Sequence, residues 1–531
     1  MSLPVDQRLS VLSGFYRRPS TTQAAADAIP LLVDDEYQIF HLTTPPNTVH
    51  HPQRLRSSWS RIRSKDLVHW TRDQNPVITP TAFGVNDNFD QDADGAWTGS
   101  AVLDPHGNLR IFYTGYNLAK GGKQVILNAT SYDRHGSKVT KTKGEIQITS
   151  DSDRSAFEDI DFRDPYIFFN EEDQLYWMLI ATRLACGPSP TRGCIALLTS
   201  TDLDAWHLSP TPLYAPHDMI CPECPELFSL KGKWYLIYSR FHAPDAGTVY
   251  RIADSPSGPF RVPKDGSHGR LDGRRWYAAK SCGKVENIDK RIFFGWVADW
   301  NADDGKWLWG GDLALPREVS ANEDGTLRIR PAIDLNQGAL LQLDIKAKSP
   351  EIMESVLVEA VGRTRVQRLV CTSVPATSTH ILEFTIVDHD CVSFGLIFRP
   401  DKDHTGFKLR CTPSPSDGFF TATIEYPNPP LDDFWADQYK LYLPRQVDGP
   451  EIVRHDHLRL REPVTIYAAN DTVEVFLGGR SMTFRMTSKL GQDPAAVEEL
   501  YAMFVKDGKV ELGGMKMTVL DPPGATLKNL A

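Results

Sequence analysis

Three acidic residues stand out because each lies close to the start of an aromatic, β-branched run: Asp27, Asp164 and Glu223. Asp164 lies between Arg163 and Pro165 in DFRDPYIFF, where the adjacent guanidinium can hold it as a carboxylate. Taken alone, an Asp-Pro pair is more typical of a turn. Asp27 comes just before the first aromatic run and is unremarkable by itself, so the interest lies in the set of three.

Glu223 lies between two prolines in MICPECPELFS, a rigid and apolar setting that suits a general acid. Glu226 is a second acidic candidate that the spacing does not exclude. Cys221 and Cys224 form a C-x-x-C, but no second ligand pair follows at a suitable spacing, so the sequence does not predict a zinc site.

The runs beside these acidic residues belong to a recurring pattern: a short strand, a turn with Asp, Gly or Lys, then an aromatic strand. It recurs at intervals of roughly 50 to 70 residues, close to the period of propeller blades. The inner strands of a propeller line its central channel, so carboxylates on the first strands of three blades would converge there. The occurrences are VDDEYQIFHL, DPHGNLRIFYTGY, NEEDQLYWMLIATR, SLKGKWYLIYSR and NIDKRIFFGWVADW.

The pattern changes near residue 335, where longer strands with alternating polar and apolar residues begin. Such alternation is typical of a β-sandwich. We therefore predict an all-β protein, with a five-bladed β-propeller catalytic domain over residues 1–340 and a C-terminal β-sandwich over residues 341–531. The charged stretch from about 427 to 464 is predicted to be a loop within the sandwich.

Composition excludes several classes of function. The formal charge of −10 argues against binding to nucleic acid, which needs a basic face. No apolar run approaches the roughly 18 residues of a membrane helix. The N-terminus has no apolar signal core, and the eight cysteines are scattered, so we expect a cytoplasmic protein with reduced thiols.

The chain resembles glycoside hydrolase family 32, the family of invertases, inulinases and levanases. Its Arg-Asp-Pro and Glu-Cys-Pro motifs match residues 163–165 and 223–225. Further similar segments follow one another from about residue 27 to 515. They are DLVHW at 66–70, WTGS at 97–100, GRRWYAAK at 273–280, FFGWVADW at 293–300, LALPREV at 313–319 and DTVEVFLGG at 471–479.

One motif departs from the family. The family begins with Asn-Asp-Pro-Asn-Gly, whereas this chain has Asp27 in the stretch Ala-Asp-Ala-Ile-Pro. The glutamine expected after the first strand is also absent, near Leu42. The resemblance therefore predicts a remodelled first sugar subsite.

The resemblance implies a retaining hydrolase that cleaves terminal β-fructofuranosidic bonds in fructose-containing oligosaccharides, without a metal or cofactor. Asp27 would be the nucleophile, Glu223 the general acid/base, and Asp164 the stabiliser of the transition state. The residues expected to bind the substrate are Arg163, Trp97, Thr98, Trp296 and an acceptor-side pair, Asp272 and Arg275. The last two are equally compatible with a surface ion pair in a loop.

Other functions remain open on the sequence. A fructosyltransferase, including an enzyme that forms or hydrolyses a difructose anhydride, would share the covalent intermediate. An arabinofuranosidase-like propeller hydrolase would also use three carboxylates. A carbohydrate-binding homologue without activity is the non-enzymatic alternative, because function depends on the site and not on the fold. The expected partner is an oligosaccharide, and a homo-oligomer is compatible with the sequence.

Overall fold

In the part of the chain that the computed structural model describes, nearly all regular structure is strand, with three short 3-10 helices at Asp90–Asp92, Leu118–Lys120 and Ser189–Thr191. No helix within its described part is long and apolar enough to cross a membrane. The residues described are 9–10, 17–20, 22–48, 56–82, 90–241, 246–285, 287–301, 306–334, 347–348, 355–369, 378–415, 418–426, 451–486 and 499–520.

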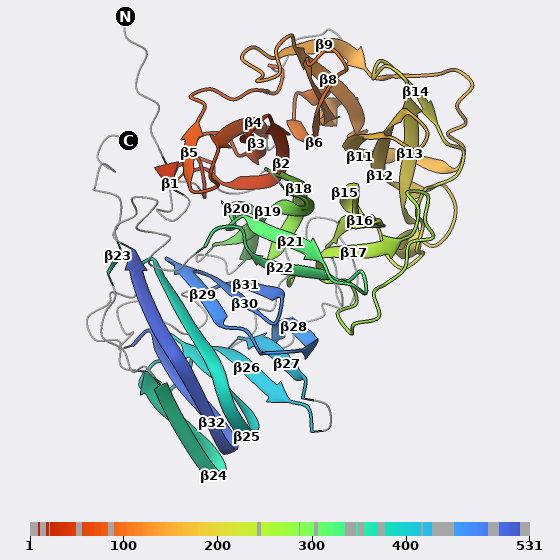
Figure 1. Cartoon of the computed structure of the whole chain (residues 1–531). Coiled ribbons are helices and arrows are strands. Elements are labelled where there is room, and N and C mark those ends of the chain that lie inside the picture. Colours follow the sequence, from red (N-terminus) through yellow and green to blue (C-terminus); the bar gives the residue numbers. More distant parts are fainter. Residues whose placement is uncertain are drawn as a thin grey trace, which may run out of the picture.

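The first part of the chain forms a five-bladed propeller (Figure 1). Each recurring sequence pattern forms the hairpin between the first and second strands of one blade, which confirms the predicted repeat. The strands of blade 1 are β2 (Ala25–Val33), β3 (Glu36–Thr43), β4 (Ser58–Ser64) and β5 (His69–Arg72), with β1 (Leu9–Ser10) at its edge. Those of blade 2 are β6 (Gly95–Leu103), β7 (Leu109–Tyr116), β8 (Val125–Ser131) and β9 (Thr140–Glu145).

Blades 3 to 5 repeat this meander with small variations. Blade 3 consists of β11 (Phe157–Asn170), β12 (Leu175–Leu184), β13 (Gly193–Ser200) and β14 (Ala205–Leu208), with β10 (Gln147–Ile148) at its edge. Blade 4 consists of β15 (Glu223–Leu230), β16 (Lys233–Arg240) and β17 (Gly247–Ala253). Blade 5 consists of β18 (Trp276–Lys284), β19 (Asn287–Asn301), β21 (Arg317–Ala321) and β22 (Leu327–Pro331).

Strand β20 (Lys306–Leu313) closes the ring, because it pairs with β19 of blade 5 and with β2 of blade 1. The pairing to β2 is made at Ala25 and Gly311. On its other side, a Cβ at Gly311 would lie 2.1 Å from the carbonyl oxygen of Val297 on β19, so the close approach of β20 to β19 requires glycine. Blades 1 and 5 therefore belong to one hydrogen-bonded sheet.

The C-terminal part is a β-sandwich in which two long strands, β25 (His380–Phe398) and β32 (Tyr501–Leu520), pair along most of their lengths. Its core is a separate cluster of buried residues that includes Leu382, Phe407 and Phe484. Its strands are β23 (Ala347–Lys348), β24 (Ser355–Leu369), β25 (His380–Phe398), β26 (Phe407–Pro413), β27 (Phe420–Glu425), β28 (Glu451–Leu458), β29 (Val464–Ala469), β30 (Thr472–Leu477), β31 (Arg480–Arg485) and β32 (Tyr501–Leu520).

Two details of the sequence-based prediction can be compared with this sandwich. The predicted loop over 427–464 was wrong for Glu451–Leu458, which pairs with β27 as β28. Residues 427–450 lie outside the described part. The boundary predicted at residue 340 also falls outside it, so the division into 1–340 and 341–531 stays a prediction.

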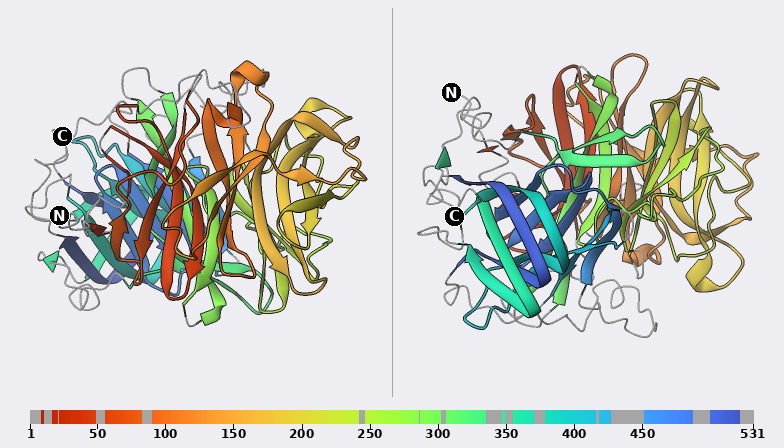
Figure 2. Two further views of the ribbon diagram at one scale, coloured as in Figure 1. Left: turned by 90° about the horizontal axis from the view of Figure 1, so that it is seen from above. Right: turned by 60° about the horizontal axis from the view of Figure 1, so that its bottom comes forward.

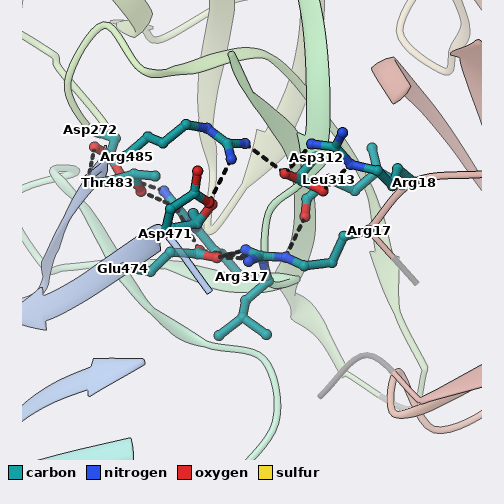
Figure 3. Close-up of polar contacts among 12 residues, drawn as sticks. Arg17, Arg18, Asp272, Asp312, Leu313, Arg317, Asp471, Glu474, Thr483 and Arg485 are labelled. Atoms are coloured by element: carbon teal, nitrogen blue, oxygen red, sulfur yellow. Dashed lines mark hydrogen bonds and ion pairs between the residues drawn. The ribbon is translucent and has the colours of Figure 1, made fainter. Parts of the chain in front are cut away.

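The sandwich lies against blade 5 and the ring closure, as Figures 1 and 2 show from three directions. Buried charges join the two parts (Figure 3). Asp312 of β20 accepts hydrogen bonds from Arg18 at 2.6 and 2.7 Å and from Arg485 of β31 at 2.6 Å. Although burial alone would raise the pKa of Asp312, the two guanidiniums hold that pKa far below its usual range.

A second group of this network centres on Arg317 of β21, which is fully buried. Its guanidinium donates to Asp272 at 2.6 Å and to Glu474 of the sandwich at 3.1 Å. Glu474 also accepts a hydrogen bond from Arg17 at 2.7 Å. The segment before β2, blade 5 and the sandwich are therefore held by shared ion pairs.

Candidate active site

Each of the five innermost strands has a register shift at the positions that the sequence singled out. A β-bulge of this kind re-aims side chains and is frequent beside active sites. The shifts lie between Ala26 and Ala28 in β2, Ala96 and Gly99 in β6, Arg163 and Tyr166 in β11, Glu223 and Glu226 in β15, and Tyr277 and Lys280 in β18.

In four of these bulges one non-glycine residue has a positive φ: 21° at Asp27, 57° at Asp164, 51° at Cys224 and 48° at Ala278. Such conformations are costly for these residues and concentrate at functional sites. Asp27 and Asp164 thus lie within their strands, Asp27 as the third residue of β2, and not ahead of them as the sequence suggested.

The three candidate carboxylates come together at the channel. Cys224, the residue after Glu223, links the other two: its backbone N–H donates to Oδ2 of Asp164 at 2.9 Å, and its thiol lies 3.9 Å from Oδ2 of Asp27. Asp164 and Glu223 are 4% and 6% exposed, and Asp27 is partly buried. Residues from blades 1, 3 and 4 therefore share one site, as the propeller prediction required.

Arg163 bridges two of these carboxylates. Its guanidinium donates to Oε1 of Glu223 at 2.9 Å and lies 3.7 Å from Oδ2 of Asp164. The other oxygen of Glu223 accepts a 2.6 Å hydrogen bond from the hydroxyl of Tyr277. Both oxygens of Glu223 are thereby oriented. The sequence analysis missed Tyr277, although it lies in the GRRWYAAK segment that carries the resemblance.

Trp296, predicted to bind the substrate, donates a hydrogen bond from its indole nitrogen to Oδ1 of Asp27 at 2.8 Å. Its ring is 2% exposed and packs edge-on against that of Tyr277. The two aromatic residues of blade 5 thus orient two of the candidate carboxylates, Asp27 and Glu223.

Burial raises the pKa of two of the candidate carboxylates, Asp27 and Asp164. Burial, followed by the charges of Asp164 and Glu223, raises the pKa of Asp27 to about 7, against the opposing effects of Trp296 and Lys280. Burial also raises the pKa of Asp164, and the Arg163 guanidinium offsets this only in part. The expectation that Arg163 helps to hold Asp164 as a carboxylate agrees with the direction of its effect on the pKa, although burial has the larger effect.

Trp97 and Thr98 lie on the bulge of β6 in blade 2. The ring of Trp97 stacks on that of Tyr116 with centroids 4.2 Å apart. The carbonyl of Thr98 accepts a hydrogen bond from the hydroxyl of Thr114, which in turn accepts from the backbone N–H of Asp164. The backbone of Thr98 is therefore connected to that of Asp164 by two hydrogen bonds through the Thr114 hydroxyl.

The acceptor-side pair is not formed as the sequence suggested. Asp272 is 0% exposed, and its carboxylate accepts hydrogen bonds from Arg317, Thr483 and the N–H of Gly273. It joins the propeller to the sandwich, and these contacts do not support its assignment as a substrate-binding residue, which stays a prediction. It is equally not part of a surface ion pair.

Arg275, by contrast, lies beside the site. Its guanidinium is 3.6 Å from the centroid of the Trp307 ring. It lines a pocket that is partly open to solvent, together with Tyr277, Trp296 and Arg240. Because Tyr277 and Trp296 bond the candidate carboxylates, this pocket adjoins them.

Two further residues bear on the sequence-based alternatives. Glu226 is 0% exposed and accepts hydrogen bonds from Ser281 and Arg291, so it is committed to blade structure and Glu223 is the better acid/base candidate. Leu42, where the family resemblance suggests glutamine, lies opposite Ala26 in the β2–β3 pairing. An apolar residue therefore stands on β3 where the resemblance suggests an amide.

The family model of the glycosyl hydrolases family 32 N-terminal domain matches residues 28–331, starting one residue after Asp27. The insoluble β-fructofuranosidase isoenzyme CWINV1 of Arabidopsis thaliana is 24% identical over 340 residues, which cover 59% of this chain and 55% of that protein. Sucrose-6-phosphate hydrolase of Escherichia coli is 27% identical over 320 residues, 56% of this chain and 60% of that protein. The chain thus matches little more than half the length of these curated relatives.

Solved structures share the whole architecture. Exo-inulinase from Aspergillus awamori has a TM-score of 0.64 at 17% identity, covering 98% of this chain and 99% of that one. Fructan 1-exohydrolase IIa from Cichorium intybus, solved in complex with 1-kestose, has a TM-score of 0.65 at 16% identity, covering 97% and 98%. At such identities the likeness establishes the fold, while the match of the family model over more than half of the chain establishes the family: this protein belongs to the glycosyl hydrolases of family 32.

Proposed function

We propose that this protein is a retaining glycoside hydrolase that releases fructose from terminal β-fructofuranosidic bonds of oligosaccharides. The observation that carries the proposal is the convergence of Asp27, Asp164 and Glu223 at one point of the channel, linked by Arg163 and Cys224. Its curated relatives include a β-fructofuranosidase and a sucrose-6-phosphate hydrolase, which supports the assignment of the bond.

In the proposed first step, a carboxylate oxygen of Asp27 bonds to the anomeric carbon while the bond to the leaving oxygen breaks. Glu223 gives its proton to that oxygen, and Asp164 stabilises the oxocarbenium-like charge. In the second step, Glu223 takes a proton from water, whose oxygen displaces Asp27 from the anomeric carbon. Retention is supported by the contact of Asp27 with Cys224, the residue next to Glu223, because retaining enzymes keep the two carboxyl groups close together.

Trp97, Thr98, Arg163, Arg275 and Trp296 remain our candidates for contacts with the sugar. Thr98 and Trp97 are fixed by backbone bonds near Asp164, and Arg275 with Trp296 lines the adjoining pocket, where the leaving group would lie. A cytoplasmic location and a homo-oligomeric state also stay predictions, which cell fractionation and light scattering would test.

Product analysis is the direct test. The purified protein is incubated with sucrose, inulin-type and levan-type oligosaccharides, difructose anhydrides and arabinofuranosides, and the products are separated by chromatography. Free fructose that retains its anomeric configuration when first formed is expected, with Asp27→Asn as the inactive control. A new disaccharide without free fructose would instead indicate a transferase, and arabinose alone an arabinofuranosidase.

An absence of product with the whole panel, from a protein that still binds one of the sugars in calorimetry, would point to a carbohydrate-binding homologue. Leu42, which stands opposite Ala26 where the resemblance suggests glutamine, is the observation that makes the wider panel necessary.

A further inference from the structure

Asp161 is a fourth acidic residue near the site, and it bonds the arginine that bridges two of the candidate carboxylates. Its Oδ1 accepts a 2.8 Å hydrogen bond from Nη1 of Arg163. The other terminal nitrogen of the same guanidinium, Nη2, donates to Oε1 of Glu223 at 2.9 Å. A guanidinium is planar and rigid, so a bond that fixes Nη1 also fixes the direction in which Nη2 points.

The side-chain amide of Gln124 strengthens this attachment. Its oxygen accepts hydrogen bonds from Nη1 of Arg163 at 3.3 Å and from the backbone N–H of Phe162 at 3.2 Å. Its nitrogen donates to Oδ1 of Asp161 at 3.3 Å. Gln124 lies directly before β8 and is 8% exposed. Blade 2 therefore supports both members of the Asp161–Arg163 pair.

Asp161 is itself held in place. It lies in the first of the two register shifts of β11, and its carbonyl accepts a 2.6 Å hydrogen bond from the Thr182 hydroxyl of β12. Burial alone would raise the pKa of its carboxyl, but the charge of Arg163, a hydrogen bond with Glu158 and the charge of Arg183 lower that pKa below its ordinary value. Asp161 is thus an ionised acceptor, and its bond to the guanidinium is charge-assisted.

Asp164, the neighbour of Arg163 in sequence, is attached differently. Its Oδ2 lies 3.7 Å from Nε of Arg163, which is longer than a hydrogen bond, and accepts instead from the N–H of Cys224 at 2.9 Å. Asp161 makes the shorter contact, although its side chain is 19% exposed and that of Asp164 only 5%. The anchor of Arg163 on β11 is therefore the carboxylate two residues before it.

We propose that Asp161 is a positioning residue of this site, which holds the Arg163 guanidinium, through Nη1, in the orientation in which Nη2 bonds Glu223. The inference rests on the proposed function for the role of Glu223 as the acid/base. Asp161 acts through Arg163 and not on the reacting atoms. Without its carboxylate the guanidinium can turn away, and Glu223 then loses one of the bonds that orient it.

The test compares Asp161→Ala and Asp161→Asn in the full chain, with the substrate that product analysis identifies. Alanine removes the acceptor, so kcat should fall about tenfold while KM stays within about twofold, because proton transfer depends on the orientation of Glu223. Asparagine keeps an oxygen that can accept from the guanidinium, so kcat should recover to within about threefold of the wild type.

A matched control is Asp73→Ala in blade 1. Asp73 also pairs with a buried arginine, Arg61, at 2.6 Å, and its side chain is 16% exposed. Arg61 further bonds Gln38 and the carbonyl of His135, not a candidate carboxylate. Asp73→Ala should therefore lower the melting temperature and leave kcat unchanged.

Three kinetic results would overturn the proposal. One is an equal loss of kcat in Asp73→Ala and Asp161→Ala, which would mean that any broken buried ion pair has this effect. The second is a change in Asp161→Ala that is confined to KM. The third is a loss in Asp161→Asn as large as that in Asp161→Ala.

A second readout needs no activity and separates this inference from the proposed function. Crystal structures of the wild type and of Asp161→Ala give the distance between Nη2 of Arg163 and Oε1 of Glu223. It should lengthen beyond about 3.5 Å in the variant. An unchanged bond would refute the positioning role even if the protein cleaves fructosides. A displaced guanidinium in a protein that cleaves none of the panel would support that role and refute only the proposed function.

Discussion

The indole nitrogen of Trp296 lies 2.8 Å from Oδ1 of Asp27 and donates a hydrogen bond to it across the junction between blades 5 and 1. Trp296 on β19 pairs with Leu313 of the closing strand β20, whose Gly311 pairs with Ala25 of β2. The ring closure and the orientation of the proposed nucleophile therefore depend on the same three strands.

This bond predicts the pH dependence of activity. Since the pKa of Asp27 is raised to about 7, kcat/KM should fall as the pH decreases below about 7. Trp296→Phe removes a donor that lowers this pKa, so the acid limb should move to higher pH. A pH–rate profile of both proteins checks this, and a limb that stays in place in the variant would contradict the role of the bond.

The same pKa shift has a consequence for stability. An aspartate with an ordinary pKa of 3.8 that is raised to about 7 in the folded state contributes stability that is complete below pH 3.8 and is lost as the pH rises through about 7. Asp27→Asn should therefore gain stability relative to the wild type between pH 4 and 7. Denaturant titrations across that range test the sign, and a constant difference at every pH would count against it.

Glu223→Gln should lower kcat by about 10²- to 10⁴-fold, because it removes the proposed proton donor. Binding of the oligosaccharide, measured by calorimetry, should be nearly unchanged, since glutamine keeps the shape. Glu226→Gln is the comparison: Glu226 bonds Ser281 and Arg291, so its loss should affect stability more than the rate. A full rate in Glu223→Gln would remove Glu223 from the mechanism.

Tyr277→Phe should reduce kcat about tenfold, equivalent to about 1.4 kcal/mol, because it removes the 2.6 Å bond that orients Glu223. The ring is kept, so its packing against Trp296 persists. Steady-state kinetics would show a loss mainly in kcat. A change confined to KM would mean that the hydroxyl contacts the sugar instead.

Asp272→Asn should destabilise the fold by about 3 kcal/mol, because the buried Arg317 would lose one of its two carboxylate partners. Arg275→Met, in the pocket, should instead change KM with little effect on stability. Chemical unfolding of both variants measures the contrast. Equal stability of Asp272→Asn and the wild type would show that Glu474 alone satisfies Arg317.

The sequence by itself determined the repeat and the two kinds of β-structure, and it supplied the three candidate carboxylates. Aromatic strands bounded by turn residues have a period that can be counted, and motifs such as Arg163–Pro165 carry a resemblance that needs no coordinates. Asp27 could be proposed despite its altered neighbours, because it lies where the order of the motifs along the chain places the family's first motif.

Only the tertiary structure decided which side chains meet. Tyr277 and Cys224 donate hydrogen bonds to carboxylates of other blades, and bulges, which leave no clear mark in composition, aim them there. The partners of Asp272 were not found for the same reason: they lie far away in sequence, on β21 and β31. The sign of the pKa shift at Asp164 likewise depended on burial, a property of the packed channel and not of the adjacent arginine.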